Sequence, residues 1–139
     1  PPGCLFALAV RPESPGIGGP VGAGTLLGVC LVGRPVARTL PQDGTVGEVT
    51  RLVLSGAPYA TASAVLRRAA EVARSRGMVA LIAYHDRTRH TGCIYRKAGF
   101  KKDGKTSGRP RWSKSRSDAS SRQSAEQPST SKRRWRLNL

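Results

Sequence analysis

Short apolar stretches separated by breaks rich in polar residues, glycine and proline dominate the first third of the chain. Three of these stretches, residues 4–10, 25–33 and 46–54, have the length and composition of strands, although polar and apolar positions alternate only partly in the third. The segment 11–24 is crowded with glycine and proline, which strands and helices do not tolerate. We therefore predict three neighbouring strands of one sheet, with a hairpin loop between the first two.

A helix and a buried strand follow in the middle of the chain. In residues 61–76 the apolar positions recur with the spacing of one helical face, and Gly77 supplies a stop. Residues 78–84 form a near-continuous apolar run, as expected of a strand covered on both faces. Strand, helix and strand make a β-α-β unit, which implies a parallel pairing and a right-handed crossover. A short helix over 91–98 and a strand opened by Phe100 complete the order βββαβαβ.

The composition changes toward the C-terminus. Residues 106–131 are rich in serine and nearly devoid of aliphatic residues, so they cannot bury enough apolar surface to fold alone. Polar and apolar positions then alternate over 134–139, which indicates a last strand that returns to the sheet. We expect an α/β domain whose mixed central sheet is flanked by helices, with a core over 1–105, a basic loop over 106–131 and a final strand over 132–139. Because the numbering starts at Pro1 without a methionine, we allow for an N-terminal element that precedes it.

Charge narrows the choice of partner. The chain has 24 Lys and Arg residues against 8 Asp and Glu, a formal net charge of +16. Each phosphate neutralised by Lys or Arg releases condensed counterions, so this excess favours a polyanion, and we expect double-stranded DNA. In the basic loop, cations flank an indole that could stack on a base, and we predict nucleic-acid contacts at Arg109, Arg111, Trp112 and Lys114. The alternatives are a tail that adheres weakly without specificity and a tryptophan that only anchors the loop.

Cysteines and apolar runs exclude several classes of protein. Three cysteines without a CxxC pair indicate neither a disulfide framework nor a zinc knuckle, and they fit a reducing cytoplasm. No apolar run approaches the length needed to span a bilayer, and no secretory signal peptide is evident. We therefore expect a cytoplasmic protein without a membrane partner, whose oligomeric state the sequence does not indicate.

The residues with the greatest potential for chemistry gather in 84–100, directly after the predicted buried strand. The carboxyl end of such a strand is where α/β proteins usually bind ligands, which makes Asp86 a candidate to orient or deprotonate an amine. The alternative is an aspartate that caps the following turn. His85 and His90 could hold iron or zinc together with Asp86, but two histidines five apart are a weak signal, and we predict no metal site. His90 is a better candidate for a proton carrier or a contact to a DNA phosphate.

Several segments together resemble the core of GNAT-type acyltransferases. The resemblance rests on the strand 48–54, the small-residue turn into helix 61–76, the strand that ends at Tyr84, and the Tyr-x-x-x-Gly-Phe motif within 94–100. It implies an acyl-CoA donor, acetyl-CoA or a related thioester, whose pyrophosphate lies at the turn before the main helix. It also implies that Tyr95, the tyrosine of the motif, protonates the departing thiolate, and the alternative is a tyrosine that only packs in the core.

A second, more specific resemblance links the chain to the Mom-like proteins of bacteriophages. It is carried by Asp86, His90, Gly92, the pair 94–95 and the closing residues 132–135. Those proteins have a GNAT-like fold and attach a carbamoylmethyl group to adenine in phage DNA, which protects the genome from restriction. The resemblance implies a DNA-modifying transferase acting in a bacterial host cell, with Asp86 facing the adenine amino group. Iron stays an alternative cofactor that no residue pattern supports.

The turn before the main helix departs from the GNAT pattern. Arg or Gln followed by Gly-x-Gly or Gly-x-Ala is usual there, whereas residues 56–63 are mostly small. Free N–H groups at the start of helix 61–76 would still bind a phosphate through geometry and dipole. We expect the donor to contact Leu52, Leu54, Ala60, Thr61, Ala62 and Ser63. An ordinary N-cap would also explain Thr61.

Arg51 completes the predicted catalytic set of Arg51, Asp86 and Tyr95. A charged side chain inside a strand is costly unless it is paired or reaches a cleft, so we expect Arg51 to steady negative charge on the donor or the transition state. A surface pair with Glu48 or Asp86 is the alternative. Three functions stay open: a DNA adenine-modifying transferase, which we favour, a nucleic-acid-binding protein that has lost its activity, and an N-acetyltransferase acting on a protein or small-molecule amine.

Overall fold

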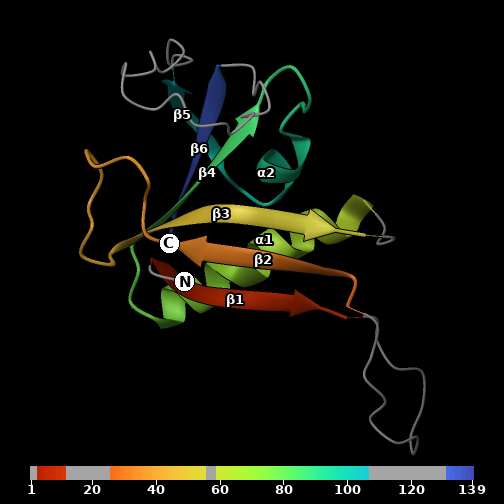
Figure 1. Ribbon diagram of the computed structural model, residues 1–139, viewed down its shortest axis with the longest axis horizontal. Helices are drawn as coiled ribbons and strands as arrows, with labels where there is room; N and C mark the ends of the chain where they lie inside the picture. The colour runs from red at the N-terminus through yellow and green to blue at the C-terminus, as the bar shows by residue number, and fades with distance from the viewer. Residues whose placement is uncertain (1–2, 12–25, 56–58, 107–130) are drawn as a thin grey trace, which may run out of the picture.

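The computed structural model describes residues 3–11, 26–55, 59–106 and 131–139, which form a mixed sheet of six strands and two helices (Figure 1). In chain order the elements are β1 (Cys4–Val10), β2 (Gly28–Gly33), β3 (Val46–Leu54), α1 (Tyr59–Ser75), β4 (Ala80–Asp86), α2 (Cys93–Lys97), β5 (Lys101–Thr106) and β6 (Lys132–Asn138). The strands lie side by side in the order β1-β2-β3-β4-β6-β5, and every pair is antiparallel except the parallel pair β3 and β4. The α/β class and the predicted order of elements are confirmed.

α1 covers one face of the sheet. The apolar side of this helix consists mostly of small residues. Leu66, Ala69 and Ala73 are fully buried there, in the same cluster as Cys30 and Leu81 of the sheet. Alanine adds little bulk between backbone and sheet, so the helix lies close to the strands. α2 packs beside α1 on this face, as Figure 1 shows.

α1 begins two residues earlier and ends one residue earlier than predicted. The helix begins at Tyr59, so Thr61 lies within the first turn and is not the N-cap. At the other end, the N–H groups of Gly77 and Met78 donate to the carbonyls of Arg74 and Ala73 at 3.0 and 3.1 Å, with Gly77 at φ +77°. This is a Schellman-type cap. Met78 completes the cap, which is why β4 begins two residues later than predicted.

The opposite face carries a smaller cluster beneath the segment 34–45. Its buried members are Val46, Ala80 and Ile82, with Leu40 and Tyr84 packed against them. Glu48 is also buried, and its Oε2 accepts a hydrogen bond of 2.8 Å from the Val36 N–H. Gln42 Nε2 donates to three carbonyls within the same segment. These bonds hold 34–45 against the sheet.

The predicted last strand does return to the sheet, and β6 lies between β4 and β5. Its alternating pattern turns Trp135 into the core, where 3% of the residue is exposed. Most of the predicted hairpin loop 11–24 and of the basic loop 106–131 lies outside the described residues. Neither of the helices in the described ranges has the length and apolar character needed to traverse a bilayer.

Candidate functional site

β3 and β4 stop pairing halfway along their length. The parallel ladder ends with Val49 opposite Ala83. Beyond this point β3 continues to Leu54 paired with β2, and β4 continues to Asp86 paired with β6. Figure 1 shows the two strands turning away from each other. A β-bulge at Thr50 accompanies the divergence, because two steps of β3 match one step of β2 at that point.

Tyr95 lies on the helix-covered side of the sheet, in a cluster of aromatic rings. α2 carries the residue, of which 8% is exposed. Its ring is stacked on His85 and Trp135, with centroids 5.9 and 5.7 Å away, and meets Phe100 edge-on at 5.9 Å. Contacts with three rings therefore fix the orientation of the phenol.

The phenol of Tyr95 is held in its protonated form. Burial, and to a lesser extent the thiol of Cys30, raise the pKa of Tyr95. Cys30 is paired in register with Leu52, which belongs to the part of β3 that has left β4. Tyr95 therefore interacts with a residue of β2 that pairs with the divergent part of β3.

A hydrogen bond between residues 50 positions apart fixes the state of His85. Trp135 Nε1–H donates to His85 Nδ1 at 2.6 Å, and both residues are buried. Because an indole N–H can only donate, Nδ1 keeps its lone pair and the neutral ring carries its proton on Nε2. Burial is the main cause that lowers the pKa of His85, followed by three basic neighbours, while Asp86 acts in the opposite direction. The basic neighbours are His90, Arg133 and Arg87.

The loop before α2 lies directly on this hydrogen-bonded pair. Gly92 has φ +76°, and a Cβ atom there would come within 2.6 Å of Trp135 Cζ2 and 2.7 Å of His85 Cε1. Only glycine combines this backbone conformation with so close an approach. Gly92 thus allows the loop to pack against the His85–Trp135 pair.

Asp86 caps the turn after β4. Its Oδ1 accepts hydrogen bonds from the N–H and the hydroxyl of Thr88 at 2.8 and 2.7 Å, and its Oδ2 lies 4.0 Å from Arg89 Nε. This is the turn-capping arrangement that the sequence left as an alternative. It also fixes the carboxylate at the end of β4, so the capping role and a role in chemistry are compatible.

Arg51 is exposed beside the bulge in β3. Within the described ranges it forms no ion pair, and Glu48, one of the two partners considered, is bonded to the backbone of Val36 instead. Burial raises the pKa of Glu48, while the Val36 N–H and the charge of Lys132 act in the opposite direction. The partial alternation of the strand did not reveal that Glu48 is a buried carboxylate.

The predicted donor contacts occupy the end of β3 and the first turn of α1. Leu52 and Leu54 are half-buried, Ala60 is exposed and Thr61 is half-buried. Ala62 and Ser63 are buried, and the Ser63 hydroxyl donates to the carbonyl of Ala60 at 3.0 Å. The turn residues 56–58 lie outside the described residues.

Four of the five predicted nucleic-acid contacts lie outside the described residues, namely Arg109, Arg111, Trp112 and Lys114. His90 is exposed, and its backbone N–H donates to the carbonyl of Asp86 at 3.0 Å. Over the part of the chain that the structure describes, no group of three or more His, Cys, Asp and Glu side chains could hold a metal ion.

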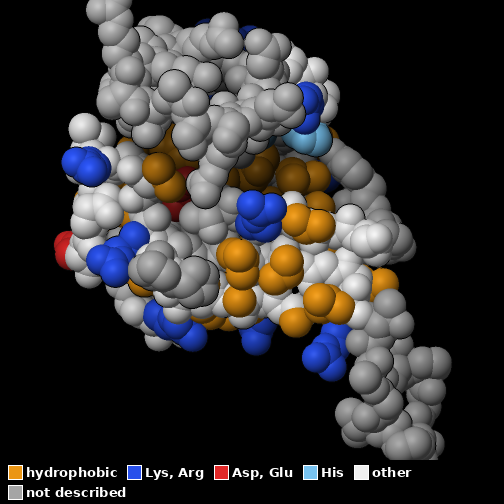
Figure 2. Space-filling model, viewed as in Figure 1, with side chains coloured by type: hydrophobic (Ala, Val, Ile, Leu, Met, Phe, Trp, Pro, Cys, Tyr) orange, Lys and Arg blue, Asp and Glu red, His pale blue; other side chains and the backbone are white. Residues whose placement is uncertain are grey.

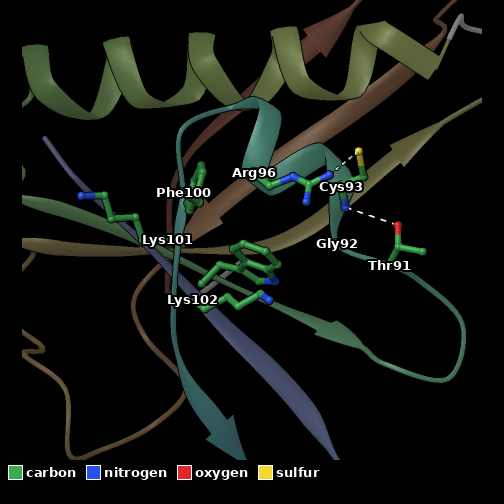
Figure 3. A pocket seen from close by; sticks show the side chains of 8 residues that line it. Thr91, Gly92, Cys93, Arg96, Phe100, Lys101 and Lys102 are labelled. Carbon is green, nitrogen blue, oxygen red and sulfur yellow. Dashed lines mark hydrogen bonds between the residues drawn. The ribbon is translucent and has the colours of Figure 1, made fainter.

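Two adjoining hollows flank α2 on the side of β5 and β6. The larger has a volume of about 390 Å³ and is lined by residues that include Cys93, Arg96 and Phe100. The smaller has a volume of about 220 Å³ and includes His85, Arg87, His90 and Arg133. Both share Thr91, Lys102 and Trp135. Figure 3 shows the larger hollow, with Lys101 pointing away from it and Arg96 lying along α2 toward Cys93.

Lys and Arg side chains are spread around the visible face of the molecule in Figure 2, with few acidic side chains among them. A patch of apolar side chains lies at its centre. The sequence predicted a strongly basic protein, but it did not indicate where the described charges converge. His85, Gly92 and Trp135 were not predicted as a unit, because their contacts join segments far apart in the chain.

The sequence matches no protein-family model and no curated protein. Solved structures do share the fold. An IAA acetyltransferase from Bacillus cereus superposes with a TM-score of 0.58 at 17% identity, over 85% of this chain and 73% of that one. A Bacillus subtilis acetyltransferase in complex with CoA gives 0.58 at 14% identity, over 85% and 72%. A GNAT family acetyltransferase from Elizabethkingia anophelis with acetyl-CoA bound gives 0.58 at 13%, also over 85% and 72%. The chain therefore has the fold of GNAT acetyltransferases.

Proposed function

We propose that this protein is a transferase that moves an acyl-type group from a CoA thioester to an amine on nucleic acid, with the adenine amino group of double-stranded DNA as acceptor. The observation that carries the proposal is the divergence of β3 and β4 beyond Val49 and Ala83, beside the buried phenol of Tyr95. The fold supports acyl transfer in general, since structures that share it include acetyltransferases with CoA or acetyl-CoA bound.

The residues around the divergence fit a CoA donor. Residues 50–54 of β3 no longer pair with β4, so this edge offers a line of backbone groups to an extended chain that carries amides. Leu52 and Leu54 add apolar surface there. The first turn of α1 presents backbone N–H groups and the positive end of the helix dipole, and Ala60 leaves room for a pyrophosphate. When bound, acyl-CoA would supply an activated carbonyl and a thiolate leaving group.

Tyr95 would supply the proton that the leaving sulfur requires. In the transfer, the acceptor nitrogen forms a bond to the acyl carbon, the carbon–sulfur bond breaks, and one proton passes from nitrogen to sulfur overall. A tyrosine hydroxyl is protonated at neutral pH, and burial raises the pKa of Tyr95 further, so the hydroxyl carries the proton that the sulfur needs. The stacked rings of His85 and Trp135 hold that hydroxyl in one direction.

Asp86 would accept the proton that the acceptor nitrogen releases. Side chains alternate along β4, which puts Asp86 on the same face as Tyr84 and Ile82 and opposite to the face that carries Tyr95. The base and the acid would thus act from opposite faces of the sheet. Arg51, exposed on the divergent part of β3, would steady negative charge on the acyl oxygen.

The formal net charge of +16 supports DNA as the carrier of the amine, as does the resemblance to Mom-like proteins. A carbamoylmethyl group in place of an acyl group would fit that resemblance equally. Protection of phage DNA from restriction in a bacterial host would be the biological consequence.

A second candidate is an N-acetyltransferase that acts on a protein or small-molecule amine. Its support is that structures with this fold include an IAA acetyltransferase and an aminoglycoside acetyltransferase. A nucleic-acid-binding protein without activity is the third.

Mass spectrometry of nucleosides from DNA co-expressed with the protein separates these functions. We expect a modified adenine nucleoside with the wild type and none with Asp86→Asn, which keeps an oxygen for Thr88 but removes the charge. Asp103→Asn is the matched control, since the Asp103 carboxylate pairs with Arg134 at 2.8 Å and has no assigned role. Unmodified adenine together with acetylation of added amines would favour the second function, and no turnover of either kind would favour the third.

A further inference from the structure

The smaller hollow beside α2 concentrates positive charge from three separate segments. The loop after β4 contributes Arg87 and His90, β5 contributes Lys102, and β6 contributes Arg133. None of the described residues that line either hollow is acidic. Basic side chains that converge from distant positions attract anions.

The described acidic groups of β4 and β5, Asp86 and Asp103, already have partners. Asp86 lies close enough to His85 to affect its pKa, but its Oδ1 accepts two hydrogen bonds from Thr88. Asp103 of β5 pairs with Arg134 at 2.8 Å. Within the part of the chain that the structure describes, no carboxylate of the lining therefore neutralises the cations of this hollow.

A hydrogen-bond donor of a largely buried residue also lines this hollow. His85, of which 7% is exposed, commits Nδ1 to Trp135 and so carries its proton on Nε2. Among the described residues none accepts a hydrogen bond from Nε2. A neutral N–H donor among cations is suited to an anionic oxygen, because it adds a directed hydrogen bond to the charge.

We infer that this hollow binds a backbone phosphate of nucleic acid, with Arg87, Lys102 and Arg133 as its cations and the Nε2–H of His85 as its oriented donor. The larger hollow continues from it past Thr91 and Lys102 and adds Arg96. A basic path over two adjoining hollows suits successive phosphates of a polymer better than one free anion. The inference deepens the proposed function and rests on it, because it gives the acceptor nucleic acid a place on the described core.

The test compares two variants that remove the same charge. The hollow variant replaces the three cations of the hollow by glutamine: Arg87→Gln, Lys102→Gln and Arg133→Gln. The control variant replaces three exposed arginines elsewhere by glutamine: Arg34→Gln, Arg38→Gln and Arg74→Gln. Binding of a labelled DNA duplex to the full chain is measured by fluorescence anisotropy at several salt concentrations. Each lost phosphate contact lowers the slope of log K against log salt by about 0.9, which is about eightfold in affinity at 0.1 M salt.

We expect the slope of the hollow variant to fall by about two to three and that of the control by less than one. Equal losses in both variants, or no loss in the hollow variant, would overturn the inference. Loss of binding to phosphatidylglycerol vesicles with duplex binding intact would also overturn it and would favour a membrane surface.

A measurement on the unaltered site covers the case in which the triple variant does not fold. In the Trp112→Phe protein, the single remaining indole N–H signal in NMR comes from Trp135, whose N–H bonds to His85. We expect this signal to shift on titration with duplex, and an unmoved signal while backbone signals elsewhere shift would contradict the inference. If the two variants differ in salt dependence as expected but the wild type does not modify adenine, the proposed function is refuted. The phosphate site is still supported in that case.

Discussion

Replacement of Gly92 by alanine tests how tightly the loop before α2 is fitted to the His85–Trp135 pair. The new Cβ atom would lie 2.6 Å from Trp135 Cζ2 and 2.7 Å from His85 Cε1, and both rings are held by stacking on Tyr95. A left-handed conformation costs an alanine about 1–2 kcal/mol. Overpacking of a filled site adds about 1–3 kcal/mol. We therefore expect Gly92→Ala to lower the free energy of unfolding by about 2–5 kcal/mol.

Gly77→Ala is a matched control for this change. Gly77 has φ +77°, against +76° for Gly92, but a Cβ atom at Gly77 meets nothing within 4 Å. The backbone cost is therefore common to both variants, and only the packing cost of about 1–3 kcal/mol should separate them. Urea unfolding followed by circular dichroism gives both free energies. Equal losses in the two variants would refute the claim that Gly92 is required by the rings beneath it.

Two further predictions concern buried titratable groups. Because the pKa of His85 is lowered on folding, the unfolded chain binds its proton first, so stability should fall as pH drops below about 6.5. His85→Gln should weaken this dependence in urea unfolding at several pH values, and an unchanged dependence would contradict the buried neutral state. The pKa of Glu48 is raised on folding, so the stability of Glu48→Gln relative to wild type should rise with pH above about 4.5, since glutamine still accepts from the Val36 N–H. Glu48→Leu leaves that N–H without its acceptor and should cost about 1–3 kcal/mol, and a stable leucine variant would show that the bond is unimportant.

Local patterns were sufficient for the order of the elements, because apolar periodicity and glycine or proline breaks act within a few residues. The run that became β4 is buried on both faces, and the alternation in β6 turned Trp135 inward as expected. Element ends were less predictable. Met78 looked like part of the strand, but its N–H is used to close α1.

The site depends more on contacts that no local pattern encodes. The bulge at Thr50 leaves Thr50 and Arg51 both exposed, although side chains normally alternate between the two faces of a strand. The environment of Arg51 could therefore not be predicted from that alternation. The bond between His85 and Trp135 joins residues 50 positions apart, and the sequence alone does not indicate which strand β6 will pair with. The basic lining of the smaller hollow arises from that same pairing, because it brings Arg133 opposite His85.

The central claim is that the strand divergence beside Tyr95 is an acyl-transfer site, and the turnover of Tyr95→Phe tests it most directly. Phenylalanine keeps the ring that stacks on His85 and Trp135 and removes only the hydroxyl proton. The measurement is release of free thiol from acetyl-CoA in the presence of duplex DNA, with acetyl-CoA affinity determined by calorimetry on the same samples. We predict that Tyr95→Phe lowers kcat by about 10²–10⁴-fold and leaves the affinity for acetyl-CoA unchanged. Turnover equal to that of the wild type would contradict the account.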